Sequence, residues 1–251
     1  MLERIEVKII CDIAKKAAIE VMKIYEKDFT IEYKEDDSPL TKADLKANSI
    51  ICENLQRLYP TIPILSEENT NIPYEIRKNW EYYWCIDPID GTKEFIKKNG
   101  EFSINIGLIY KDTPVLGVVY APDTNELYYA KKNQGAFKNG KKLPLSINRN
   151  KEEKLTVVTS KSHQNSDTQK YIDSLKAKEK NIIIKGSSLK ICMVAEGIAD
   201  IYPRLSPTME WDTAASDAIV REVGKMTYQF NTQTPVVYNK VDLLNPWFMV
   251  K

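Results

Sequence analysis

The feature that most constrains this chain is an apolar segment that runs directly into a short acidic turn. Residues 82–86, Tyr-Tyr-Trp-Cys-Ile, have the composition of a buried strand, and Asp-Pro-Ile-Asp-Gly-Thr follows at residues 87–92. We expect the strand to end at Asp87, the proline to stiffen the turn, and a helix to begin at Gly91-Thr92. Two carboxylates in one turn repel each other unless a cation lies between them. A purely structural turn needs neither the second acid nor the hydroxyl, so the segment indicates a functional site.

The composition is that of a globular protein. A chain of 251 residues predicts one large domain or two tightly joined ones. With 43% hydrophobic and 28% charged residues, a disordered or collagen-like chain is excluded. The 36 basic and 35 acidic residues leave a net charge of +1, so no general electrostatic attraction favours nucleic acid.

The sequence also indicates a location for the protein. Residues 1–27 mix acids and bases, which is typical of an amphipathic helix and not of a signal peptide. No apolar run approaches the roughly 18 residues that span a bilayer. We therefore expect a cytoplasmic protein, and a peripheral contact with the inner face of the cell membrane stays open. The cysteines lack the spacing of zinc or redox sites and are expected to be buried and reduced: Cys11, Cys52, Cys85 and Cys192.

Hydrophobic patterning predicts two portions with different secondary structure. Residues 1–150 combine two amphipathic helices, 2–25 and 41–59, with five strands, of which the last three are expected to form an antiparallel meander. The expected strands are 62–65, 82–86, 103–110, 115–121 and 127–132. Residues 151–251 alternate strands and helices, as in an α/β layer. The expected elements there are 154–160, 167–177, 181–186, 188–199, 201–204 and 211–224. We expect an α+β portion and an α/β portion packed into one compact body.

Acidic residues recur where the predicted strands end. Glu67, Asp87 and Asp90 each follow a predicted strand, and Asp212 lies at the start of a predicted helix. Carboxylate and carbonyl oxygens without nearby His or Cys suit Mg²⁺, and the carbonyl of Ile89 adds a further oxygen. The helix that follows Gly91-Thr92 offers N–H groups to a phosphate. The combination predicts phosphoryl chemistry.

Each acid outside residues 87–92 also has a purely structural interpretation, and taken singly we favour that interpretation. Asp44 lies three residues after Thr41 and forms a capping box with it, and Asp212 complements a helix dipole. Glu67 belongs to a solvated strand end, and the single histidine, His163, is a surface residue.

Four motifs in order resemble a known phosphatase family: Ser-Glu-Glu at 66–68, Asp-Pro-Ile-Asp-Gly-Thr-Lys-Glu-Phe at 87–95, Gly-Ser-Ser-Leu-Lys at 186–190 and Trp-Asp-Thr-Ala-Ala at 211–215. They resemble the lithium-sensitive, magnesium-dependent phosphatases that include inositol monophosphatase. The residues after Thr92 and the segments 115–122 and 194–204 are most similar to the 3'(2'),5'-bisphosphate nucleotidases of the CysQ type. The resemblance implies the layered αβαβα fold of the sugar phosphatases.

The resemblance implies a role for each matching position. Two or three Mg²⁺ ions would be held by Glu67, Asp87, the Ile89 carbonyl, Asp90 and Asp212. Asp44 and Thr92, together with Glu67 and its bound ion, would activate the attacking water. The positions that match substrate-binding residues are Gly91, Thr92, His163, Gly186, Ser187, Lys190, Arg204 and Asp212.

The implied substrate is a small nucleotide, adenosine 3',5'-bisphosphate, which would be hydrolysed to AMP and phosphate without a phosphoenzyme. Two alternatives stay open: an inositol monophosphatase or fructose-1,6-bisphosphatase activity, and a non-catalytic regulator that binds nucleotide or associates with RNA. The charged Lys93-Glu94 pair after Thr92 argues against the first, and the intact acids argue against the second. The sequence leaves the oligomeric state open.

Overall fold

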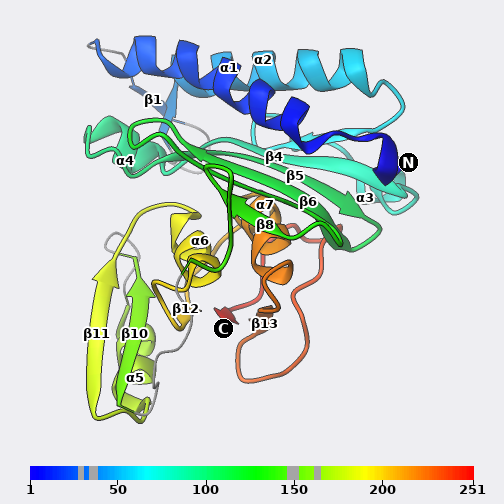
Figure 1. Ribbon diagram of the computed structural model, residues 1–251. Coiled ribbons are helices and arrows are strands. Elements are labelled where there is room, and N and C mark those ends of the chain that lie inside the picture. The colour runs from blue at the N-terminus through cyan, green and yellow to red at the C-terminus, as the bar shows by residue number, and fades with distance from the viewer. Residues whose placement is uncertain (28–30, 34–38, 146–152, 161–164) are drawn as a thin grey trace.

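The computed structural model describes residues 1–27, 31–33, 39–145, 153–160 and 165–251. Figure 1 shows helices α1 and α2 above a large sheet, helices α6 and α7 below it, and then a set of short strands. Helix α5 packs against these strands through Ile172. This order of layers is the αβαβα arrangement that the family resemblance implies. The proposed division of the chain at residue 150 stays a prediction.

The first layer consists of α1, Val7–Tyr25, and α2, Lys42–Leu58. We expected the first helix to begin at Leu2, which is wrong: a 3-10 turn at Leu2–Arg4 is followed by extended backbone, and α1 begins at Val7. The apolar spacing continued through this break because Ile5 is fully buried in the same core as α1. Helix α2 begins after Thr41 with the predicted capping box to Asp44.

The second layer is a seven-stranded sheet in which the strands follow chain order, β3 to β9. Strand β3 is parallel to β4, and all later neighbours are antiparallel, so the predicted meander is confirmed. The strands are β3 Ile64–Ser66, β4 Tyr82–Asp90, β5 Ser103–Tyr110, β6 Thr113–Ala121, β7 Glu126–Lys131, β8 Ala136–Lys138 and β9 Lys141–Lys142. The last two were not predicted because they are too short to show a hydrophobic period.

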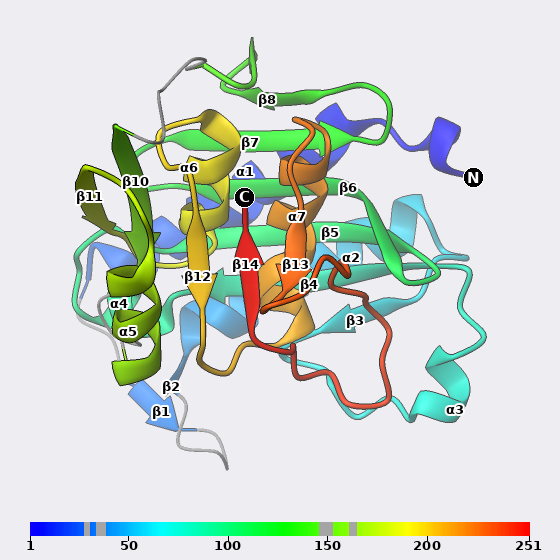
Figure 2. The same cartoon turned by 90° about the horizontal axis from the view of Figure 1, so that it is seen from below.

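Helix α7, Glu210–Arg221, crosses the lower face of this sheet beside α6, Leu189–Glu196 (Figure 2). Glycines on two strands allow the close contact. A Cβ on Gly117 of β6 would lie 1.9 Å from the carbonyl oxygen of Ala215, and one on Gly107 of β5 would lie 3.1 Å from the Cβ of Ala214. The chain therefore places its smallest residues where α7 approaches the sheet, which fixes the position of Asp212 relative to β4.

The lower strands form two small sheets. Strands β10 Lys154–Thr159 and β11 Glu179–Ile184 are parallel, and β14 Phe248–Val250 pairs antiparallel with both β12 Tyr202–Arg204 and β13 Thr227–Gln229. The N–H of Val158 donates to the carbonyl of Ile201 at 3.0 Å and joins the two sheets. Helix α5, Ser166–Ser174, packs over β10 through Ile172. The remaining elements are β1 Ile31–Tyr33, β2 Pro39–Thr41, α3 Tyr74–Arg77 and α4 Thr92–Ile96.

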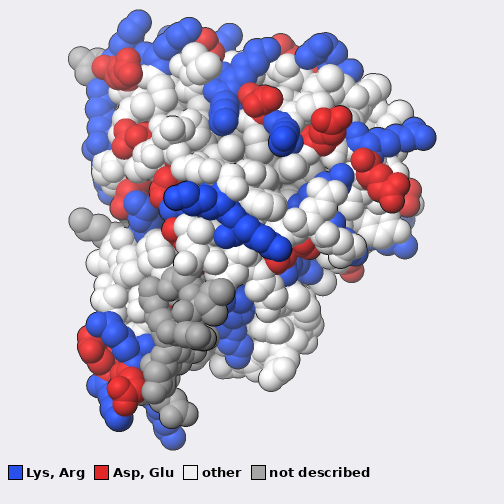
Figure 3. Space-filling model, viewed as in Figure 1, with Lys and Arg blue, Asp and Glu red and all other residues white. Residues whose placement is uncertain are grey.

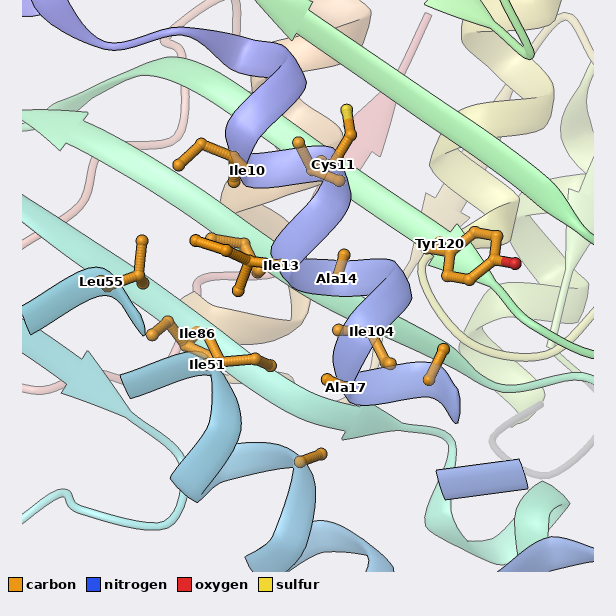
Figure 4. Packing of buried hydrophobic residues seen from close by; sticks show 14 of the residues in the cluster. Ile10, Cys11, Ile13, Ala14, Ala17, Ile51, Leu55, Ile86, Ile104 and Tyr120 are labelled. Atoms are coloured by element: carbon orange, nitrogen blue, oxygen red, sulfur yellow. The ribbon is translucent and has the colours of Figure 1, made fainter. Parts of the chain in front are cut away.

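The main core lies between the first helical layer and the upper face of the sheet. Figure 4 shows Ile13 and Ala17 of α1 and Ile51 of α2 packed over Ile86 and Ile104 of the sheet. The exposed charges form no large field of one sign on the face seen in Figure 3, where basic and acidic side chains are interspersed.

Three of the cysteines are buried and all four are free thiols. Cys52 is only half-buried, so the expectation that every cysteine is buried was wrong for this residue. Its place on the flank of α2 leaves one side of the thiol uncovered. Among the described residues no helix combines the length and the apolar character needed to cross a bilayer.

Candidate active site

Strand β4 brings Asp87 and Asp90 to one face of the sheet through a β-bulge. Asp87 lies opposite Asn105 of β5 and Asp90 lies opposite Ser103, so β4 has one extra residue in this interval. In a regular strand, residues three apart face opposite sides, and one extra residue restores a common side. The strand was expected to end at Asp87, which is wrong, because β4 continues to Asp90. A bulge within a strand, and not a turn after it, makes the two acids converge.

These acids line a cavity of about 250 Å³ at the ends of β4, α4, α6, β12 and α7. The cavity brings together residues from both halves of the sequence. Of the predicted site residues, the following line it: Glu67, Asp87, Ile89, Asp90, Gly91, Thr92, Gly186, Ser187, Lys190, Arg204 and Asp212. His163 lies outside the described residues, and its assignment stays a prediction.

The cavity concentrates acidic groups. Burial raises the pKa of Asp87 well above its ordinary value of 3.8, and repulsion from the neighbouring acids Glu67, Asp90 and Asp212 raises it further. Burial also raises the pKa of Asp212 to about 8, with added repulsion from Asp90 and Glu67. The pKa of Asp90 is raised by burial, although the nearby charge of Lys190 opposes the shift. Without a cation these groups retain protons that ordinary carboxyls would lose.

Asp44 has both its structural role and a contact with the site. Its Oδ2 accepts hydrogen bonds from the backbone N–H of Thr41 at 2.8 Å and from the Thr41 hydroxyl at 2.6 Å, which caps α2. Its Oδ1 accepts from the Thr92 hydroxyl at 3.3 Å. The Thr92 hydroxyl is also 3.1 Å from the carbonyl oxygen of Ile89. Thr92 therefore links a buried carboxylate to the acidic cavity, which is the arrangement expected for positioning a water.

Asp212 likewise combines two roles. It is the third residue of α7, and its Oδ2 accepts from the backbone N–H of Met209 at 2.9 Å. The predicted interaction with the start of a helix is therefore present. Its carboxyl also lies at the cavity, within the electrostatic reach of Asp90 and Glu67.

The turn before α6 also lines the cavity. Gly186 has no room for a side chain, because a Cβ there would lie 2.6 Å from the carbonyl oxygen of Glu101. Ser187 adopts a φ of +51°, a left-handed conformation that non-glycine residues rarely adopt. Its carbonyl accepts a hydrogen bond from the ammonium group of Lys190. Burial lowers the pKa of Lys190 to about 8, although the nearby Asp90 carboxylate opposes the shift.

Arg204, on β12, is a second buried cation at the cavity, with 7% of its surface exposed. One guanidinium nitrogen, Nη2, donates to the carbonyl of Pro207 at 2.9 Å. The buried Nε has no hydrogen-bond partner in the part of the chain that the structure describes. A buried donor without a partner costs free energy, so this atom indicates a ligand that would accept its hydrogen bond.

Sequence reasoning missed three polar residues beside Asp90. Asn105 and Ser103 of β5 and Ser188 before α6 are all buried and hydrogen-bonded to one another. A signal existed in the sequence, because Ser103 and Asn105 alternate with apolar residues at the start of the strand. Their importance depends on which strand lies beside β4, which a single sequence does not show.

The acidic cavity fits a hard divalent cation. It offers the carboxylates of Glu67, Asp87, Asp90 and Asp212 and the Ile89 carbonyl, and the repulsion between the acids would be relieved by a positive ion. Among the described residues, no three acidic, histidine or cysteine side chains already form a finished metal cage. Asp90 and Asp212 instead accept backbone N–H groups of Ser188 and Met209. The carboxyls would therefore turn toward an ion when it binds.

The layered fold and the acid-lined cavity together match one family. The model of the inositol monophosphatase family matches residues 4–246, and the chain belongs to this family. The chain is 42% identical over 243 residues to the 3'(2'),5'-bisphosphate nucleotidase CysQ of Salmonella typhimurium, covering 96% of this chain and 97% of the relative.

Solved structures show the same relationship. The crystal structure of CysQ from Bacteroides thetaiotaomicron, a bacterial member of the inositol monophosphatase family, has a TM-score of 0.88 and 42% identity, covering 98% of this chain and 96% of that one. The IMPase of Thermotoga maritima has a TM-score of 0.77 and 27% identity, covering 96% and 89%. The fold is therefore shared across the family, and identity is higher toward the CysQ proteins.

Proposed function

We propose that this protein is a Mg²⁺-dependent phosphatase that removes the 3'-phosphate of adenosine 3',5'-bisphosphate and leaves AMP. One observation carries the proposal: a single cavity is lined both by the acids Glu67, Asp87, Asp90 and Asp212 and by two buried cations, Lys190 and Arg204. The acids suit a metal ion and the phosphate that reacts. The cations suit a second phosphate that does not react. Full-length relatives named 3'(2'),5'-bisphosphate nucleotidase support the same substrate.

The acids would hold the metal. Glu67, Asp87 and the Ile89 carbonyl would hold one Mg²⁺, and Asp90 and Asp212, with Asp87 shared, would hold a second. When bound, Mg²⁺ lowers the pKa of a coordinated water and neutralises charge that develops on phosphate oxygens. The number of ions remains part of the proposal.

Asp44 and Thr92 would position the attacking water. The Thr92 hydroxyl lies between the Asp44 carboxylate and the Ile89 carbonyl, so it can donate to one of them and accept from a water. Burial raises the pKa of Asp44, although hydrogen bonds from Thr41 oppose this shift. A carboxylate with a raised pKa is a better proton acceptor at neutral pH, which suits a general base acting through Thr92.

The second phosphate would lie between α6 and β12. The unpartnered Arg204 Nε can donate to a phosphate oxygen, and the Lys190 ammonium adds a positive charge nearby. The pocket thus distinguishes a substrate with two phosphates from one with a single phosphate. A substrate such as inositol monophosphate would leave the Arg204 donor without an acceptor.

A panel of phosphate esters tests the proposal. We expect phosphate release from adenosine 3',5'-bisphosphate to have a much higher kcat/KM than release from inositol 1-phosphate or fructose 1,6-bisphosphate, and to stop when EDTA removes Mg²⁺. A preference for either sugar phosphate would instead support the first alternative activity. Nucleotide binding without phosphate release at saturating Mg²⁺ would support the non-catalytic alternative.

A further inference from the structure

A chain of hydrogen bonds connects Asp90 to the turn before α6. The Asn105 amide Nδ2 donates to Asp90 Oδ2 at 3.4 Å. The Oδ1 of the same amide accepts from the Ser103 hydroxyl at 3.0 Å and from the Ser188 hydroxyl at 2.9 Å. The Ser103 hydroxyl is in turn 2.8 Å from that of Ser187. One side chain on β5 therefore contacts both a cavity acid and the turn before α6.

The direction of these hydrogen bonds is fixed by chemistry. Asp90 Oδ2 accepts the backbone N–H of Ser188, and the Asn105 amide presents its NH₂ group to this oxygen and its own oxygen to the hydroxyls. Ser103 has one proton and donates it to Asn105, so it accepts from Ser187. The backbone N–H of Ser188 donates to the same Asp90 oxygen and closes the connection. Every polar atom of the Asn105 side chain is used within the site.

The position of Asn105 follows from the sheet. It lies opposite Asp87 on the neighbouring strand, and Ser103 lies opposite Asp90. Both are almost completely buried, Asn105 at 1% exposure and Ser103 at 0%. Burying an amide and a hydroxyl in a core costs free energy unless their partners are fixed, so the pair holds its partners in one geometry. Those partners are Asp90, a proposed metal ligand, and the Ser187–Ser188 turn, which lies next to the proposed binding site of the second phosphate.

We propose that Asn105 is a positioning residue that fixes the Asp90 carboxylate and the Ser187–Ser188 turn relative to each other, so that metal binding and binding of the second phosphate are coupled through it. This inference rests on the proposed function for the identity of the substrate. The role in metal binding does not depend on the substrate.

A set of four proteins tests this role. Asn105→Leu removes all three hydrogen bonds with little change in size, and Ser188→Ala removes one hydroxyl from the same chain. The double variant measures their coupling. Ile109→Val, on the same strand but in the apolar core, controls for a general loss of stability.

Two readouts are used: Mg²⁺ binding to the nucleotide-free protein by calorimetry, and KM and kcat for adenosine 3',5'-bisphosphate. We expect Asn105→Leu to weaken Mg²⁺ binding and raise KM by about tenfold each, the factor expected for a lost hydrogen bond to a charged group, with a smaller change in kcat at saturation. The double variant should be no worse than Asn105→Leu alone, because the two residues act through one network.

Three results would overturn the proposal: Mg²⁺ affinity of Asn105→Leu equal to wild type, additive effects in the double variant, or the same losses in Ile109→Val. If the wild type releases phosphate from no bisphosphate nucleotide, the proposed function fails. The calorimetric comparison then still decides whether Asn105 positions Asp90.

Discussion

Asp44 binds Thr41 with one carboxylate oxygen and Thr92 with the other, at 2.8 Å to the Thr41 backbone nitrogen and 3.3 Å to the Thr92 hydroxyl. The same acid therefore caps helix α2 and contacts the first residue of α4 at the cavity. The structural interpretation of Asp44 is correct, and it does not exclude the catalytic one. The two roles can be separated because each uses a different oxygen.

Substitutions at Thr41 and at Asp44 itself separate the capping role from the catalytic role. Thr41→Ala removes a capping hydroxyl and should lower the free energy of unfolding by about 1 kcal/mol with little change in kcat. Asp44→Asn retains the size of the side chain but removes the base, and should lower kcat by roughly 10²–10⁴. Urea unfolding and steady-state kinetics measure both. Equal losses of kcat in the two variants would show that Asp44 acts only by holding the helix.

Asp90→Asn should abolish turnover and leave the fold intact. The variant removes one charge from the acid cluster, so Mg²⁺ binds poorly, while the repulsion that raises the pKa of Asp87 is reduced. In EDTA its free energy of unfolding should equal or exceed that of the wild type. Near wild-type phosphate release at saturating Mg²⁺ would remove Asp90 from the site.

The acid cluster should make stability depend on pH when metal is absent. Asp212 has a pKa of about 8 in the folded protein against 3.8 ordinarily, and the pKa of Asp87 is raised too. A raised carboxyl pKa means that the folded protein binds more protons than the unfolded chain, so this contribution is present below the ordinary pKa and is lost as pH rises toward 8.

Mg²⁺ should reverse this loss, because the ion takes the place of the protons. The stabilisation by Mg²⁺, measured as the difference in unfolding free energy with Mg²⁺ and with EDTA, should therefore be larger at about pH 8 than at about pH 5. Asp90→Asn serves as the control and should show a smaller difference. Equal stabilisation at both pH values would argue against shared protons in the cavity.

Arg204→Ala should reduce selectivity for substrates with two phosphates. A charge-assisted hydrogen bond contributes about 1.5–3 kcal/mol, so kcat/KM for adenosine 3',5'-bisphosphate should fall by about one to two orders of magnitude. Hydrolysis of a 3'-monophosphate should change little. Arg57→Ala, on the exposed flank of α2, is the matched control. A parallel fall for both substrates would assign Arg204 to the reacting phosphate or to the fold.

Much of the fold and the acidic half of the site could be predicted from the sequence. The helical period of α1 and α2, the Thr41 capping box and the strands of the meander depend on residues close together in the sequence. The structure contains all of these elements. The acids at residues 87–92 were found because two like charges around a proline have no structural purpose in a turn.

The remaining features depend on contacts between distant segments. The bulge in β4 appears only when Asp87 and Asp90 are paired with β5, and the pattern of this segment alone predicts that the strand ends at Asp87. The left-handed φ of Ser187 could not be predicted, because serine rarely adopts this conformation whereas glycine often does. Asn105 was missed because two of its partners, Asp90 and Ser188, lie on other segments of the chain.

The identity of the product tests the central claim most directly. The purified protein is incubated with adenosine 3',5'-bisphosphate and Mg²⁺, and the nucleotide and phosphate formed are quantified by chromatography. The account predicts AMP and inorganic phosphate in equal amounts, and neither in EDTA. Adenosine 3'-phosphate as the product, the same rate in EDTA, or no phosphate at all would contradict it.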